Sequence, residues 1–368
     1  MRIVAVETRL VDLPLPRPIG TAIHAIRSVG CVLVTLRTDD GIAGESFVFT
    51  INGARLAAFD EMIRGLGELI VGRDPHDTGA IWSDLWMEVN PTGHAGVTIA
   101  AMSSLDVACW DIVGRAADLP LSKVFGACRD SVDTYASSGL WLDASLSDIV
   151  AEATSFVEQG FTAVKLRIGN DRIGDDVERV RAVRSAIGDD VRLLIDANQK
   201  FVPKDAIRFG RRLDEFDITW FEEPVAVHDL RGCAEVRAAL DIPIATGETE
   251  YTSRGIKQLL DQRAADIVMP DLQRIGGYTE FRRSQPWPRP TTRPCHPTSS
   301  PNTACASQPP PPTASRSSTS TGSLHCSPNR SNSATGESSS RTAPGRDSRS
   351  ADDLGGLVDP RTRTTEIE

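Results

Sequence analysis

Four acidic residues follow short apolar runs at nearly equal intervals along the middle of the chain. The segments LLID, WFE, IATGE and IVMPD end in Asp196, Glu222, Glu248 and Asp271, which are 26, 26 and 23 residues apart. If the apolar runs are successive parallel strands joined by helices, their carboxyl ends converge on one mouth of a barrel. Carboxylates gathered there repel one another unless a cation lies among them. The pattern therefore predicts a divalent metal site.

Two basic residues lie on an earlier apolar segment, AVKLRIG. Lys165 and Arg167 are two positions apart, so on a strand their side chains point to the same face. A solvated strand face is the alternative, but the apolar neighbours Val164, Leu166 and Ile168 argue against it. Cations in the same mouth would favour the charged forms of the carboxylates there. We therefore expect both basic side chains beside the metal site.

The segments around the acidic residues indicate which elements position them. Residues 204–216 and 256–265 have apolar side chains at the spacing of an amphipathic helix. Residues 1–52 instead alternate and contain the hairpin signal Asp40-Gly41, so we expect a small antiparallel sheet there. Residues 53–126 again have helical spacing. A chain of 368 residues can hold one large barrel and a smaller domain.

Composition argues against several classes of partner. The net charge of −10 makes binding to nucleic acid or to an anionic membrane surface unexpected. No uninterrupted apolar run reaches the ~18 residues that a membrane-spanning helix needs, and residues 1–15 alternate like a strand rather than a signal segment. The seven cysteines show no CxxC pair and no framework spacing, so we expect free thiols in a cytoplasmic protein.

Several motifs occur together in one order. The segments AVKLRIG, LLIDANQ, WFEEP, IATGE and MPDLQRIGG, with SLDVACWDIVGR before them, make residues 1–283 resemble the mandelate racemase / muconate-lactonizing family of the enolase superfamily. The resemblance implies an α/β fold, in which an α+β capping domain covers a modified (β/α)7β TIM barrel with Mg2+ in its mouth. Residues 1–126 would form the cap, and residues 127–283 would form the first six strands of the barrel.

The resemblance also implies roles for residues around the metal. The ligands of Mg2+ would be Asp196, Glu222 and Glu248, although a purely structural Ca2+ or Mg2+ site is the alternative for this acidic set. Asn198 would lie beside the ion, and Ser137 would contact the substrate near it. We therefore expect Asn198 and Ser137 to contribute to substrate binding.

The catalytic groups implied by the resemblance flank the substrate. Lys165 and Arg167 match a Lys-x-Lys pair whose second member is the base on one face. Asp271 matches an aspartate that orients a histidine base on the opposite face. His24 lies in the loop 14–28, where the family closes over the far end of the substrate, although a solvated loop residue is the alternative. Because arginine stays protonated, Arg167 favours chemistry with one base over racemisation.

The expected reaction is Mg2+-dependent abstraction of the α-proton of a 2-hydroxy carboxylate through an enediolate, whose charge a hard cation stabilises. With one base, dehydration of an acid sugar is favoured, and the histidine acts as base and as acid for the leaving group. A mandelate-type racemase or epimerase is the alternative. A muconate-lactonizing cycloisomerase is less expected, because the resemblance implies a lysine on the sixth strand for that subgroup and none follows Lys257. The intact enzyme would act on a small carboxylate and form a homo-oligomer.

The sequence changes character after about Arg283. Between Ile275 and Val358 there is no Val, Ile or Met, and proline and serine dominate. Residues 284–368 are therefore predicted to be a non-native, disordered tail. The codons from Arg283 onward permit VAALAAAYDTPVSPHLFPE in a shifted frame, which contains a Ser-Pro-His typical of the seventh strand of the family. We hypothesise a frameshift near Arg283, and the alternative to an enzyme is a catalytically dead or misfolded product.

Overall fold

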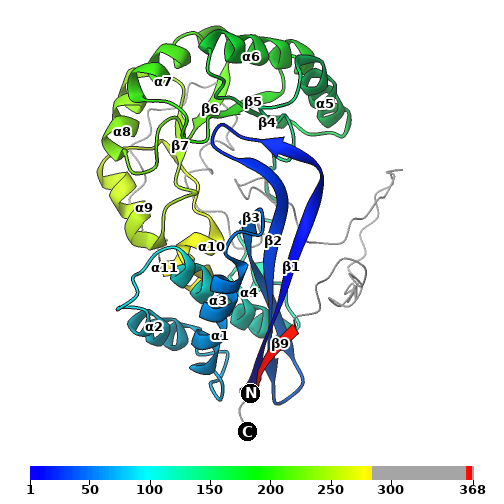
Figure 1. Cartoon of the computed structure of the whole chain (residues 1–368), viewed down its shortest axis with the longest axis vertical. Coiled ribbons are helices and arrows are strands. Elements are labelled where there is room, and N and C mark those ends of the chain that lie inside the picture. Colours follow the sequence, from blue (N-terminus) through cyan, green and yellow to red (C-terminus); the bar gives the residue numbers. More distant parts are fainter. Residues whose placement is uncertain (284–361, 367–368) are drawn as a thin grey trace.

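The structure, a computed structural model, describes residues 1–283 and 362–366 (Figure 1). These residues form a four-stranded antiparallel sheet, in the order β3-β2-β1-β9, and a five-stranded parallel sheet, in the order β4-β5-β6-β7-β8. Helices cover the outer side of the parallel sheet (Figure 1). The predicted fold class, an α+β cap with a barrel-type α/β sheet, is confirmed, although the parallel strands of the described residues do not close into a barrel.

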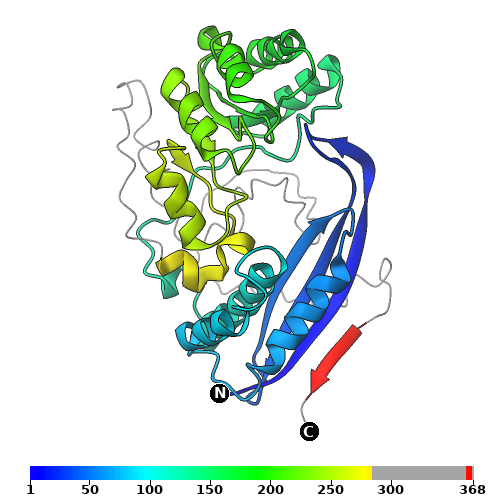
Figure 2. The ribbon, with the colours of Figure 1, turned by 60° about the vertical axis from the view of Figure 1, so that its left-hand side comes forward.

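One long hairpin forms the basis of the antiparallel sheet. β1 (Ile3–Gly20) and β2 (Ala25–Thr38) pair along most of their length. β3 (Ala43–Ile51) follows the expected turn, in which Gly41 has a φ of 85°, a conformation that glycine adopts without steric cost. The tip of the hairpin extends to the parallel sheet (Figure 2). There the backbone N–H of Gly20 donates to the Asp143 carboxylate over 2.9 Å.

The helices α1 (Leu56–Glu68) and α3 (Val97–Ala116) pack on this sheet, and α2 (Thr78–Glu88) and α4 (Leu121–Val124) pack against α3. Among the described residues, α3 alone is long and apolar enough to cross a membrane, although polar residues interrupt its apolar sequence. Its apolar window is 72% buried inside the protein, against α1, α2 and β3. α3 is therefore the central core helix of the cap.

The parallel sheet alternates with helices in the predicted way. Its strands are β4 (Ala163–Arg167), β5 (Arg192–Asp196), β6 (Ile218–Glu222), β7 (Ile244–Thr246) and β8 (Ile267–Val268). The helices are α5 (Leu146–Glu158), α6 (Ile173–Ile187), α7 (Pro203–Gly210), α8 (Leu230–Ala239), α9 (Thr252–Asp261), α10 (Leu272–Ile275) and α11 (Gly277–Arg283), with the 3-10 turn η1 (Asp214–Phe216) before β6. Ala136 forms a parallel bridge with Val164 beside β4, at the position expected for the preceding strand.

The predicted tail lies mostly outside the described residues. Residues 284–361 and 367–368 lie outside the described residues, so the disordered tail and the shifted-frame histidine at codons 297–298 stay predictions. The domain boundary after residue 126 also stays a prediction. The exception is β9 (Thr362–Glu366), which pairs antiparallel with residues 5–9 of β1 where composition indicated no strand.

The cap docks on the end of the parallel domain through buried polar contacts. The Asp106 carboxylate of α3 accepts a hydrogen bond of 2.9 Å from the backbone N–H of Thr279 in α11. Trp110 donates to the Thr279 hydroxyl over 2.9 Å. Gly277 has a φ of 86°, and a Cβ at this position would overlap the Asp106 carboxylate. Burial raises the pKa of Asp106 from 3.8 to about 7, although the hydrogen bonds from Thr279 lower it.

This contact predicts a pH-dependent stability. Because the pKa of Asp106 is higher in the folded protein, its stabilising contribution is complete below pH ~4 and is lost as the pH rises through about 7. The difference between 3.8 and about 7 is worth at most ~4 kcal/mol. Urea unfolding of Asp106→Asn from pH 4 to 8 should show a flatter profile than the wild type. The exposed control Asp190→Asn should keep the wild-type slope, and an unchanged slope in Asp106→Asn would contradict this assignment.

A second buried group fixes the barrel helices to the strands. The Arg184 guanidinium, on α6, donates to the carbonyls of Phe216, Gly188, Val191 and Asp217 over 2.6–3.1 Å. These carbonyls belong to the end of α6, the start of β5 and the turn before β6. One side chain thus satisfies acceptors from three consecutive segments, as buried carbonyls require.

Replacing Arg184 should therefore destabilise the parallel domain. Arg184→Met leaves several buried carbonyls without donors, each worth ~1–3 kcal/mol, so we expect a loss of at least ~2 kcal/mol in the free energy of unfolding. The matched control is Arg181→Met on the same helix, whose pair with Glu215 is 3.7 Å long and exposed. Exposed pairs contribute ~0–1 kcal/mol. Equal losses in the two variants, measured by chemical denaturation, would refute the role given to Arg184.

Candidate active site

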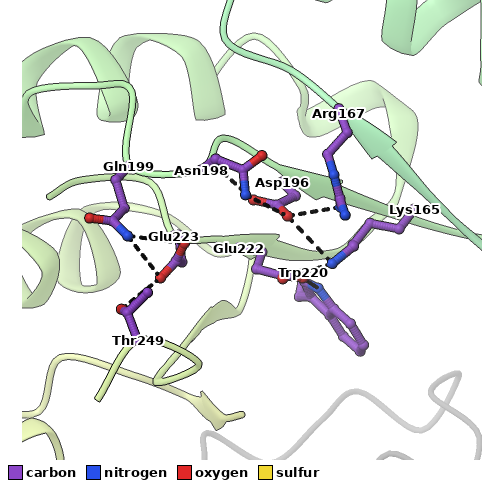
Figure 3. Close-up of polar contacts among 9 residues, drawn as sticks. All are labelled: Lys165, Arg167, Asp196, Asn198, Gln199, Trp220, Glu222, Glu223 and Thr249. Atoms are coloured by element: carbon purple, nitrogen blue, oxygen red, sulfur yellow. Dashed lines mark hydrogen bonds and ion pairs between the residues drawn. The ribbon is translucent and has the colours of Figure 1, made fainter. Parts of the chain in front are cut away.

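The parallel register brings the predicted residues into one row. Arg167 at the end of β4 lies opposite Asp196 at the end of β5, and Asp196 lies opposite Glu222 at the end of β6. Lys165 shares the face of Arg167, one pleat earlier on β4. Glu248 follows β7, which continues the same sheet edge. The sheet thus gathers the predicted side chains of β4, β5 and β6 at one edge, as Figure 3 shows for Lys165, Arg167, Asp196 and Glu222.

The cations and carboxylates of this row form direct ion pairs. Lys165 Nζ lies 2.8 Å from Glu222 Oε1 and 3.4 Å from Asp196 Oδ2. Arg167 Nη1 lies 2.8 Å from the same Asp196 oxygen. The side chains of all four residues are at most 1% exposed. Trp220 adds a hydrogen bond of 3.1 Å from its indole N–H to Glu222 Oε2. Buried charges of this kind persist only when paired and hydrogen-bonded.

Negative charge exceeds positive charge in this buried cluster. The carboxylates outnumber the cations by two when all are ionised, and the six buried side chains are Lys165, Arg167, Asp196, Glu222, Glu223 and Glu248. Burial raises the pKa of Glu222 to about 8, and Asp196 raises it further against the lowering effect of Lys165. The surplus is the electrostatic condition that a divalent cation would satisfy.

Lys165 keeps its proton in this setting. Burial and the neighbouring Arg167 lower its pKa, but Glu222 and Asp196 raise it more strongly, so the pKa lies above the ordinary value of 10.5. The β4 face therefore presents two cations. Neither is suited to take a proton at neutral pH, because an arginine also stays charged.

The donor atoms fit a hard cation in kind and in charge. Glu248 Oε2, Asn198 Oδ1 and Ser137 Oγ are buried and have no hydrogen-bond partner among the described residues, although buried polar atoms are normally satisfied. Mg2+ prefers carboxylate and amide oxygens of this type. In the described residues no three His, Cys, Asp or Glu side chains already converge on one point, since Lys165 lies between Asp196 and Glu222. The chemistry of these residues fits Mg2+. In this structure the proposed ligands Asp196 and Glu222 are ion-paired with Lys165 and Arg167.

The backbone near the site departs from regular geometry. Asn198, Gln199 and Glu223 have φ values of 42°, 67° and 40°, and non-glycine residues in this region store strain that is typical of functional sites. The Asn198 backbone N–H donates to Asp196 Oδ1 over 2.8 Å. Glu223 is buried, yet our interpretation of the sequence gave it no role. The sequence feature that could have identified Glu223 is the pair of glutamates in WFEEP, of which only the first was given a role.

Two predicted residues, Asp271 and His24, are not part of the ion-paired cluster. Asp271 is buried and caps α10 by accepting a hydrogen bond of 2.9 Å from the backbone N–H of Arg274. Burial raises the pKa of Asp271. No histidine of the described residues forms a hydrogen bond or ion pair with it. The partner histidine proposed for Asp271 would belong to the part of the chain outside the described residues.

His24 is exposed in the turn between β1 and β2. This turn reaches the loop after β4, because a Cβ added to Gly169 would lie 2.6 Å from the Cβ of Ala22. The cap hairpin therefore lies over the end of β4, as expected for a loop that covers the site. The structure leaves the role of the His24 side chain a prediction.

Comparisons with known proteins identify the two parts of the chain. Residues 5–126 match the mandelate racemase / muconate lactonizing enzyme N-terminal domain, and residues 148–297 match the enolase C-terminal domain-like family. The L-talarate/galactarate dehydratase of Salmonella typhimurium is 34% identical over 286 residues, covering 76% of this chain and 72% of the relative. The D-galactarolactone cycloisomerase of Agrobacterium fabrum is 36% identical over 286 residues, covering 77% and 74%.

A solved relative gives the same result. The crystal structure of a racemase from Streptomyces coelicolor A3(2) with bound magnesium has a TM-score of 0.73 and 34% identity, covering 77% of this chain and 79% of that chain. The resemblance inferred from the ordered motifs is confirmed, and its relatives are enzymes. The chain belongs to the mandelate racemase / muconate lactonizing enzyme family of the enolase superfamily.

Proposed function

We propose that this site removes the α-proton of a 2-hydroxy carboxylate with the help of Mg2+ and that the reaction is dehydration of an acid sugar. The buried surplus of negative charge beside two cations supports this proposal most directly. Magnesium in solved relatives bears out the expected cofactor. Relatives named as dehydratases of talarate, galactarate and arabinonate support the acid-sugar class.

The chain's own residues divide the work between binding and proton transfer. Asp196, Glu222 and Glu248 would hold Mg2+, with Asn198 beside it. The ion supplies Lewis-acid stabilisation of the negative charge that develops on the substrate carboxylate. Lys165 would bind that carboxylate as a permanent cation, and the buried Ser137 hydroxyl, free of other partners in the described residues, can donate to it.

Arg167 would stabilise charge rather than accept a proton. The proton would then leave on the opposite face, toward a histidine oriented by Asp271. That same histidine would return a proton to the departing hydroxyl, as a single acid–base group can in a dehydration. A racemase or epimerase is the runner-up, because one solved relative is named a racemase.

A product without turnover is the alternative of another class. The described parallel sheet ends at β8, and the talarate/galactarate dehydratase match covers 76% of this chain. Both observations agree with a changed C-terminal quarter. The small carboxylate substrate, the cytoplasmic location and the homo-oligomer stay predictions. A cytoplasmic location agrees with the free thiols at Cys31, Cys109, Cys128 and Cys233.

Metal binding can be tested without turnover. Isothermal titration with Mg2+ should show one site, and Glu248→Gln should weaken it about tenfold or more, since even outer partners of a metal cost that much. Glu235→Gln, an exposed change on α8, should bind like the wild type. A wild-type chain that fails to bind Mg2+ would contradict the proposed cofactor site.

The frameshift and the reaction are tested together. Sequencing the coding DNA across codons 278–300 should reveal one missing or added base. Protein from the corrected frame should then convert galactarate or L-talarate to a 2-keto product, whereas the present chain should bind Mg2+ without turnover. Incubation in D2O separates the reactions, because α-proton exchange without loss of water would favour the racemase. Dehydration by the present chain would refute the inactive alternative.

A further inference from the structure

We propose that Glu223 is a positioning residue that ties together the loops after β5, β6 and β7, which carry or adjoin the proposed Mg2+ ligands. We call Glu223, Gln199 and Thr249 the loop brace. The proposal rests on the proposed function, because it assigns the loop brace the task of holding Asp196, Glu222 and Glu248 at metal-binding separation. It concerns a residue that accepts hydrogen bonds from neighbouring loops rather than one that reaches the substrate.

The loop brace connects three neighbouring loops at the carboxyl edge of the parallel sheet (Figure 3). The Gln199 amide Nε2 lies 3.3 Å from each oxygen of the Glu223 carboxylate. The Thr249 hydroxyl donates to Glu223 Oε1 over 3.0 Å. Gln199 follows β5, Glu223 follows β6 and Thr249 follows β7, so Glu223 is the central member that receives a donor from each side.

Gln199 is held by both polar atoms of its side-chain amide and by its backbone N–H. Its Oε1 accepts a hydrogen bond of 3.0 Å from the backbone N–H of Val227. Its backbone N–H donates to the Glu223 carbonyl over 2.8 Å. The left-handed conformations of Gln199 and Glu223 are costly for these residue types. Contacts that fix the side chains compensate this cost and define the path of both loops.

The positions of the brace residues in the sequence couple them to the ligands. Glu223 is next to Glu222, and Thr249 is next to Glu248. A change in the angle between these loops therefore moves the adjacent carboxylates directly. Mutation of the partners that orient metal ligands typically lowers metal affinity about 10–100-fold.

A direct role as a metal ligand is less consistent with the contacts of Glu223. Both of its oxygens already face donors in the loop brace. Glu248 Oε2 differs, since it is buried and has no hydrogen-bond partner among the described residues. Figure 3 shows Glu223 with Gln199 and Thr249 on one side, apart from Lys165 and Arg167. Burying another carboxylate in a site already rich in negative charge is costly. The role of Glu223 in orienting the loops explains why a carboxylate is buried there.

The test uses the full chain and Mn2+ as a spectroscopic substitute for Mg2+. Thr249→Val removes the hydroxyl with little change of shape, Thr249→Ser keeps the hydroxyl, and Glu223→Gln places an amide donor opposite the Gln199 amide. Electron paramagnetic resonance should show that Thr249→Val and Glu223→Gln raise the dissociation constant for Mn2+ about tenfold or more. Thr249→Ser should stay close to the wild type. Glu235→Gln is the matched control for loss of a carboxylate.

A second measurement needs no metal. Hydrogen exchange of the metal-free protein should show faster exchange at the backbone N–H groups of Gln199 and Val227 in Thr249→Val and Glu223→Gln, with protection of the strands unchanged. Wild-type binding of Mn2+ with equal binding by these two variants would overturn the positioning role. If the wild type binds no Mn2+ while the two amides still lose protection, the proposed metal site fails but the loop brace stands as the link between these loops.

Discussion

The burial of like charges at one edge of the parallel sheet constrains the rest of this structure. Four carboxylates and two cations lie within the ends of β4 to β7, almost fully removed from solvent. A buried carboxylate without a partner is expensive, so each must be paired, hydrogen-bonded or supplied with a cation. Lys165 and Arg167 meet this need for Asp196 and Glu222, while Glu248 has one oxygen without a hydrogen-bond partner in the part of the chain that the structure describes.

Parallel pairing is what makes this concentration of charge possible. In a parallel sheet the carboxyl ends of the strands lie at the same edge, and the loops that follow them are free to vary without disturbing the sheet. The register of β4, β5 and β6 places Arg167, Asp196 and Glu222 side by side. The outer helices bury the other face, and Arg184 joins α6 to the starts of β5 and β6 from the opposite edge. Stability and chemistry thus reside at opposite ends of the same strands.

Much of this arrangement could be predicted from the sequence because strand periodicity and the recurring acidic residues are local signals. Lys165 and Arg167 share a face as a period of two requires, and Asp196 and Glu222 end their strands as expected, whereas Glu248 and Asp271 lie just after β7 and β8. The brace made by Glu223 could not be predicted in the same way. It depends on left-handed backbone at Gln199 and Glu223, which no hydrophobic pattern encodes. The docking of Asp106 on Thr279 is similar, since helical spacing identifies α3 but not its partner.

Arginine at position 167 links charge balance to the course of the reaction. Its guanidinium donates to Asp196 over 2.8 Å and lies 5.1 Å from the centre of the Trp141 ring. Both contacts stabilise a planar cation, and neither favours loss of a proton. A lysine at this position could serve as a base in its neutral form, and the cluster would then lose one of the two positive charges that offset its carboxylates. An arginine side chain stays charged, so in the proposed reaction the proton of the substrate would leave on the face of Asp271. Burial raises the pKa of the Asp271 carboxyl group there.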